Sequence, residues 1–271
     1  MRTATAAMDR AITAARDGDF RSTILWAKQA LQFDPRLEQA YLLLGSSCEE
    51  LGDTECARSA YRRGLEALPD SAALLRERGL LQLQDNDPRA AIQDLERAFR
   101  LAPDPETKTD LAFAYLFSEQ PQRARILSRE AVESKPDCFL CWMGRAEILT
   151  RLERHQDAVQ AYRTAYELDP KAKDARIGMA QAFFRLGEYE QSHLIFEELV
   201  SRDPEDGRLR VQAAQAALQN GSYRAAIEHL EYLSSANPND RALHQYLLKA
   251  QRAAGDEAAA KETERKLDRM N

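Results

Sequence analysis

Seven prolines recur at a nearly constant interval along this 271-residue chain. They are Pro35, Pro69, Pro103, Pro136, Pro170, Pro204 and Pro238, so the interval is 34 residues except for one of 33 between Pro103 and Pro136. A fixed period of this length is typical of a chain built from stacked copies of one supersecondary unit. The spacing therefore predicts a repeat array.

Small residues occupy two fixed places in every repeat. The first set is Ala11, Gly45, Gly79, Ala112, Ala146, Ala180 and Ala214, and the second is Thr23, Ala57, Ala91, Ala124, Ala158, Ser192 and Ala226. Two helices approach to about 8 Å only where the facing side chains are small. Each repeat is therefore predicted to contain two helices that cross closely at these places. A third such place holds Leu199 and Leu233 in the last two repeats, where we expect the packing to change.

A turn is predicted between the two helices of each repeat. Gly18, Gly52, Gly187 and Gly221 stand at this place, and glycine suits a left-handed residue after a helix. Asn86 also suits it, whereas Glu119 and Glu153 fit it poorly.

Further motifs identify the repeat by resemblance. Residues 41–48, YLLLGSSC, fit the pattern W-x2-L-G-x2-Y with Tyr in place of Trp and Cys in place of the second Tyr. Trp142 occupies the tryptophan position of the fifth repeat, and Leu168, Asp169 and Pro170 form a typical repeat ending. The chain resembles the tetratricopeptide repeat (TPR) family over nearly its whole length.

The resemblance implies an all-α, right-handed α-solenoid of antiparallel helix pairs. It implies one continuous domain over 1–271, without an internal domain boundary. About seven full repeats are expected, over residues 4–37, 38–71, 72–104, 105–138, 139–172, 173–206 and 207–240. A C-terminal capping pair is expected over 241–271, because the sequence from Glu257 to Met270 carries charge on both helix faces.

Composition excludes several classes of function. The formal net charge is −6 and there is no block of Lys and Arg, so a nucleic-acid partner is not expected. No run of about 18 apolar residues is present, so direct membrane insertion is not expected either. We expect a soluble protein, cytoplasmic in preference to periplasmic, since a periplasmic location would require a leader removed before this numbering begins.

No convergent set of catalytic groups is recognisable. The four histidines (residues 155, 193, 229 and 244) are scattered over four repeats, and the motifs of phosphate loops, serine hydrolases and zinc proteases are absent. We therefore expect no enzymatic activity, no cofactor and no metal site.

Four cysteines form two local pairs, Cys48 with Cys56 and Cys138 with Cys141. The second pair has CxxC spacing at a helix start, where a thiol pKa can be lowered. Three interpretations remain open: inert thiols, which the context favours, structural disulfides, or a redox or metal-binding pair. Cys48 and Cys56 could bridge two antiparallel helices if their Cα atoms lie within about 7 Å.

The resemblance also implies a concave groove, lined by the first helix of each pair, that binds a peptide or helical segment of a partner protein. The residues expected to line it are Leu42, Leu80, Phe113, Phe117, Met143, Glu147, Ile177 and Gln181. Gly144 and Gly178 are expected to leave hollows on this face. An exposed apolar patch rimmed by charge is typical of an interaction site.

The predicted function is a non-catalytic scaffold or adaptor for one or more proteins. The carboxylate clamp of chaperone-binding TPRs is absent, because Met8, Ile12, Leu43, Ala73 and Glu77 stand at its places. The alternatives are a self-assembling structural protein, a component of a cell-envelope assembly or export complex, and, lower in preference, a thiol redox sensor.

Overall fold

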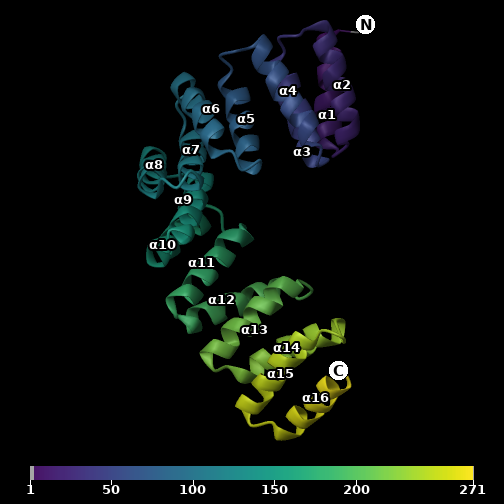
Figure 1. The fold of residues 1–271 in the computed structure, drawn as a ribbon, viewed down its shortest axis with the longest axis vertical. Coiled ribbons are helices and arrows are strands. Elements are labelled where there is room, and N and C mark those ends of the chain that lie inside the picture. The colour runs from purple at the N-terminus through teal and green to yellow at the C-terminus, as the bar shows by residue number, and fades with distance from the viewer. Residues whose placement is uncertain (1–2, 271) are drawn as a thin grey trace. The chain divides into compact units, whose positions relative to one another are not determined.

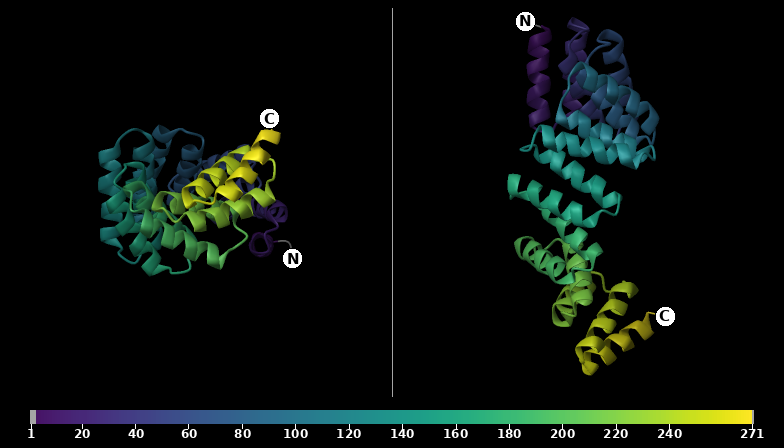
Figure 2. Two further views of the ribbon diagram at one scale, coloured as in Figure 1. Left: turned by 90° about the horizontal axis from the view of Figure 1, so that it is seen from below. Right: turned by 90° about the vertical axis from the view of Figure 1, so that its left-hand side faces the viewer.

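The structure is a computed structural model that describes residues 3–270, and in this range it contains sixteen α-helices and no strand. The chain divides into two compact units, Met1–Gly144 (unit 1) and Arg145–Asn271 (unit 2). Each unit is a stack of antiparallel helix pairs (Figures 1 and 2). The predicted all-α fold of helix pairs is therefore confirmed. The boundary falls inside a continuous helix, and the prediction of one domain over the whole chain stays a prediction.

The helices of unit 1 are α1 (Ala4–Arg16), α2 (Phe20–Phe33), α3 (Glu38–Glu50), α4 (Thr54–Ala67), α5 (Ala72–Gln84), α6 (Pro88–Leu101), α7 (Pro105–Phe117) and α8 (Pro121–Ser134). Helix α9 (Phe139–Arg151) contains the boundary. Those of unit 2 are α10 (His155–Leu168), α11 (Lys173–Leu186), α12 (Tyr189–Arg202), α13 (Gly207–Asn220), α14 (Tyr223–Ala236), α15 (Arg241–Ala254) and α16 (Glu257–Arg269). Odd-numbered helices are the first of each pair.

The small residues lie where the helices pack most closely. All fourteen are buried in the structure. A Cβ added at Gly45 would lie 2.2 Å from Tyr61 Cε1, so the ring of α4 occupies the space that a side chain on α3 would need. The close approach predicted from residue size is therefore confirmed at this crossing. Leu199 and Leu233 are also buried, so the larger residues at the third place pack in the core.

Every turn inside a helix pair passes through one left-handed residue. The glycines at this place have positive φ, and so do Asn86 (59°), Glu119 (60°) and Glu153 (56°). Glu119 and Glu153, which we expected to fit this place poorly, take the left-handed conformation there all the same. The turn geometry is imposed by the packing of the two helices it joins.

Aspartates start many of the helices. Asp19, Asp53 and Asp87 each accept a hydrogen bond from a backbone N–H three residues on, at 3.0, 3.0 and 3.1 Å. Such a cap satisfies one of the N–H groups that a helix N-terminus leaves without a partner. The left-handed residue and the capping residue after it explain why the second helix begins where it does.

A second recurrent hydrogen bond ties α3, α9, α13 and α15 to the proline that precedes each of them. Tyr41 Oη donates to the Pro35 carbonyl at 3.1 Å, and Trp142 Nε1 donates to the Pro136 carbonyl at 2.8 Å. Arg210 and His244 make the same contact to Pro204 and Pro238 at 2.8 and 3.0 Å. In these four repeats the tryptophan position holds a hydrogen-bond donor, and arginine and histidine serve there as well as tyrosine and tryptophan; in the third repeat Leu75 stands at this place.

Candidate functional site

The first helices of unit 1 present an apolar face. Leu42, Leu80 and Met143 are half-buried on α3, α5 and α9. On α7, the rings of Phe113 and Phe117 stack with their centroids 6.4 Å apart, and Phe117 is 42% exposed. The structure thus leaves part of this predicted surface open to solvent. Leu42 also packs on the core of the unit, so it contributes less free surface than Phe117 does.

The two glycines expected to leave hollows do not leave them. A Cβ added at Gly144 would lie 2.3 Å from Thr109 Cγ2 and 3.2 Å from Phe113 Cε2. In unit 2, a Cβ added at Gly178 would lie 2.4 Å from Tyr162 Cε1. Neighbouring side chains fill both places, so the expectation is wrong. These glycines permit close helix packing and form no subsite.

Charged groups lie on the same helices as the apolar side chains of unit 1. Arg76 Nε on α5 lies 2.6 Å from Asp110 Oδ2 on α7. Burial raises the pKa of Asp110, and this effect exceeds the opposite effect of Arg76 beside it. Burial also raises the pKa of Glu77, with Glu49 and Asp110 adding repulsion. The surface therefore combines aromatic rings with partly desolvated carboxyl groups.

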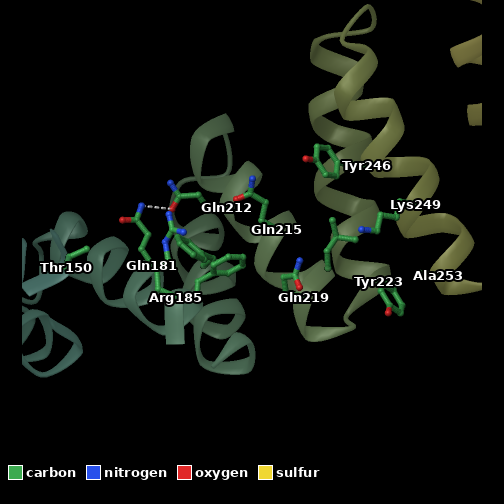
Figure 3. Close-up of a pocket in the computed structure, with 13 residues that line it drawn as sticks. Thr150, Gln181, Arg185, Gln212, Gln215, Gln219, Tyr223, Tyr246, Lys249 and Ala253 are labelled. Carbon is green, nitrogen blue, oxygen red and sulfur yellow. Dashed lines mark hydrogen bonds between the residues drawn. The ribbon is translucent and has the colours of Figure 1, made fainter. Parts of the chain in front are cut away.

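The first helices of unit 2 present a different face. They border a groove of about 950 Å³ with thirteen lining residues, none of which is Asp or Glu. Gln181 on α11 donates from Nε2 to Gln212 Oε1 on α13 at 3.2 Å (Figure 3). Tyr246, 51% exposed, and Lys249 point from α15 toward α13. The groove lies wholly within unit 2.

Of the three predicted site residues in unit 2, only one lines the groove. Gln181 lines the groove. Glu147 does not line it, and its Oε1 lies 3.1 Å from Arg151 Nη2 on the same helix. Ile177 is half-buried and does not line the groove either. Because no binding is observed, the assignment of all eight residues to a partner-binding surface stays a prediction.

Sequence reasoning missed most of the residues that line the groove of unit 2. These include Arg185, Gln212, Gln215, Gln219, Tyr246 and Lys249. The period could have found several of them, because Gln215 and Lys249 follow Gln181 at intervals of 34 residues. We call residues 12, 46, 80, 113, 147, 181, 215 and 249 the groove positions; the name refers to their shared place in the repeat, and only Gln181, Gln215 and Lys249 among them line the groove of unit 2.

The structure pairs all four cysteines as two disulfides. Cys48 on α3 bonds Cys56 on α4, with Cα atoms 5.7 Å apart, and Cys138 bonds Cys141 with Cα atoms 5.3 Å apart. The preferred interpretation of inert free thiols is therefore replaced by the structural disulfides that the sequence left open. Both bonds lie in unit 1, and residues 145–271 contain no cysteine.

No group of three or more His, Cys, Asp or Glu side chains among residues 3–270 is placed to hold a metal ion. No helix in the same range has both the length and the apolar character needed to cross a bilayer.

Comparison with known proteins gives two matching families. Residues 127–243 match the TPR domain of cytochrome c-type biogenesis protein H, and residues 38–81 match a tetratricopeptide repeat family. A curated relative, BBSome complex member BBS4 of Bos taurus, is 31% identical over 140 residues. That match covers 51% of this chain and 27% of the relative, so about half of this chain corresponds to about a quarter of that protein.

Solved structures share the fold at low sequence identity. The structure of PilW, described as a widely conserved type IV pilus biogenesis factor, has a TM-score of 0.69 and 18% identity, covering 77% of this chain and 97% of PilW. A chain of the APC/C hetero-tetramer Cut9-Hcn1 has a TM-score of 0.68 and 13% identity, covering 89% of this chain and 48% of the other. Identities this low indicate a common fold only.

Proposed function

The chain belongs to the tetratricopeptide-repeat family, and from that premise we propose that it is a non-catalytic scaffold that binds a segment of a partner protein on its first-helix faces. The observation that carries this proposal is the aromatic pair on α7 of unit 1. Phe117 is 42% exposed beside Phe113, and Asp110, which is paired with Arg76, lies on the same helix α7. An exposed aromatic surface with a charged border suits an apolar anchor of a partner.

The test is partner capture with one variant and one matched control. Phe117→Glu places a charge on the aromatic surface, whereas Phe113 is left intact because its ring packs over Gly144. Phe33→Glu is the control, since Phe33 is also exposed (47%) but lies on the second helix α2. We expect the protein captured by wild type to be retained by Phe33→Glu and lost by Phe117→Glu. Affinity of the purified pair would then be measured for all three forms.

Two results would contradict this proposal. Equal retention by Phe117→Glu and Phe33→Glu would place binding away from the aromatic pair. Capture of the chain itself, with mass that grows with concentration, would favour a self-assembling structural protein instead.

A narrower role is supported by a separate observation. Two disulfides suit a protein that resides in an oxidising compartment. Together with the match to a cytochrome c-type biogenesis TPR domain, they favour a component of cell-envelope assembly or export. Alkylation of the native protein in cell lysate tests this: we expect four cysteines to react only after reduction. Reaction without reductant would argue for a reducing compartment and against this role.

A further inference from the structure

The groove of unit 2 differs in charge from the protein as a whole. The protein carries a formal net charge of −6, yet none of the thirteen lining residues is acidic. Two of them, Arg185 on α11 and Lys249 on α15, are exposed cations. Neither of these two side chains takes part in an ion pair within the described residues 3–270. The groove therefore offers two positive charges to a ligand.

Glutamine amides fill much of the space between the two cations. Gln181 and Gln212 bond each other across α11 and α13, while Gln215 and Gln219 are exposed on α13. An amide side chain carries both a donor and an acceptor, as each peptide group does. A row of such amides can bond to the main chain of a ligand whatever its side chains are.

We propose that this groove binds an extended, acidic segment of a partner polypeptide. Its main chain would bond to the amides of Gln215 and Gln219, and two of its carboxylates would pair with Arg185 and Lys249. Tyr246 and Phe184 would provide apolar contacts between these polar groups. This inference rests on the proposed scaffold function but concerns a second surface, chemically distinct from the aromatic pair of unit 1.

The spacing of the two acidic residues follows from helix geometry. Packed helices lie roughly 8–10 Å apart, and α13 separates α11 from α15 in the row of first helices, so the two cations lie on the order of 20 Å apart. An extended chain rises about 3.3 Å per residue. The two carboxylates should therefore be about six residues apart in the ligand.

A single-stranded nucleic acid is the other anionic polymer that the tyrosines could accommodate. Such binding requires a positively charged groove that follows a backbone with one charge per nucleotide. Two cations in a chain of net negative charge provide too little of this, so the observations favour a polypeptide.

The experiment measures fluorescence anisotropy of labelled probes with the full-length protein. One peptide of about nine residues carries two glutamates six positions apart; a second has the same composition with the glutamates adjacent; a third replaces both by lysine. A short oligothymidylate is the nucleic-acid probe. We expect the first peptide to bind most tightly, and about tenfold more weakly to Arg185→Glu/Lys249→Glu.

A charge-matched variant distinguishes a loss of peptide binding at the groove from a loss caused by the change in net charge. Arg163→Glu/Lys261→Glu changes the net charge of the protein equally, but these exposed residues lie outside the groove. It should bind the first peptide as wild type does, with circular dichroism confirming that both variants are folded. Gln215→Ala/Gln219→Ala should weaken all acidic peptides without changing their ranking.

Three outcomes would overturn the inference. These are tighter binding of oligothymidylate than of the peptides, equal binding of the acidic and basic peptides, and equal loss in the two charge-reversed variants. Phe117→Glu should leave acidic-peptide binding unchanged. A loss in that variant, with none in Arg185→Glu/Lys249→Glu, would also overturn the inference. Failure at the groove would leave the proposal for the aromatic surface of unit 1 standing, because partner capture with Phe117→Glu tests that surface separately.

Discussion

The groove positions differ between the two units although the helix pairs are built alike. In unit 1 they hold Ile12, Ser46, Leu80 and Phe113, of which three are apolar and half-buried. In unit 2 they hold Glu147, Gln181, Gln215 and Lys249, all polar and exposed. The buried small residues at the helix crossings, by contrast, are of the same kind in both units. Helix packing restricts the crossings, while the groove positions are free to vary and so can carry different binding chemistry.

The units also differ in their disulfides and in the direction in which the pKa values of their carboxyl groups are shifted. Both disulfides lie in unit 1. Burial raises the pKa of Glu77 and Asp110 in unit 1. In unit 2, a hydrogen bond from His229 lowers the pKa of Glu197, and one from Lys173 lowers that of Asp206. The two units should therefore respond in different ways to reductant and to acid.

The largest expected effect is at the close helix crossings, which both units have. Gly45→Val in unit 1 and Gly178→Val in unit 2 each drive a side chain into a tyrosine ring. We expect each to lower the free energy of unfolding by about 3 kcal/mol, since overpacking a close crossing forces helices apart. Residue-resolved hydrogen exchange would show the loss in the unit that carries the change. Ser46→Val, exposed on the same helix as Gly45, is the control and should change little. Equal loss in both units from either variant would mean that they unfold as one.

Reduction should affect unit 1 alone. The bond between Cys48 and Cys56 closes a loop of eight residues, and its removal should cost about 2–3 kcal/mol through the larger entropy of the unfolded chain. Hydrogen exchange with and without dithiothreitol is the measurement, and Cys48→Ser/Cys56→Ser should reproduce the effect without reductant. Faster exchange in α11–α16 on reduction would contradict the assignment of the effect to unit 1.

Replacing the two glutamates that have positive φ by glycine should stabilise both units to a similar degree. Glu119→Gly in unit 1 and Glu153→Gly in unit 2 remove the steric cost of a Cβ at positive φ, for a gain of about 0.5–1 kcal/mol each. Glu133→Gly and Glu167→Gly, at exposed positions in the last turns of α8 and α10, are the matched controls and should lose stability, by up to about 1 kcal/mol. Urea unfolding measures all four. A loss at Glu119 or Glu153 would show that the side chain makes a stabilising contact.

The smallest expected effect is a difference in pH dependence. A carboxyl group whose pKa is raised by folding stabilises the native state at low pH, and this contribution is lost as the pH rises through the folded pKa. Glu77 and Asp110 should therefore favour unit 1 in acid. A lowered pKa acts in the opposite sense, so the contributions of Glu197 and Asp206 to unit 2 are lost as the pH falls through their folded pKa values.

Carboxyl NMR titration would measure these four groups directly. We expect Glu77 and Asp110 to titrate above the ordinary values of 4.5 and 3.8, and Glu197 and Asp206 to titrate below the same two values. Glu77→Gln should remove the acid stabilisation that Glu77 gives unit 1. If Glu77 titrates normally, the burial seen on α5 does not persist in solution.

The sequence alone determined the repeat and the helix pairs. The proline period and the small residues at the crossings sufficed, because close helix packing tolerates few residue types, and a pattern repeated seven times is read with little ambiguity. The repeat register also predicted that Phe113, Phe117 and Met143 lie on the surface, because the core positions of each repeat are already occupied. Phe117 is exposed in the structure, whereas Phe113 and Met143 are half-buried.

Only the tertiary structure decided which groove residues meet and which thiols bond. Side chains on neighbouring first helices come together through packing, so the contact of Gln181 with Gln212 has no local signal. Gly144 and Gly178 were misjudged for the same reason, because the side chains that fill the space beside them belong to other helices. Cys48 and Cys56 bond because the turn brings α3 and α4 to within 5.7 Å at these Cα atoms, a distance that spacing alone leaves undetermined.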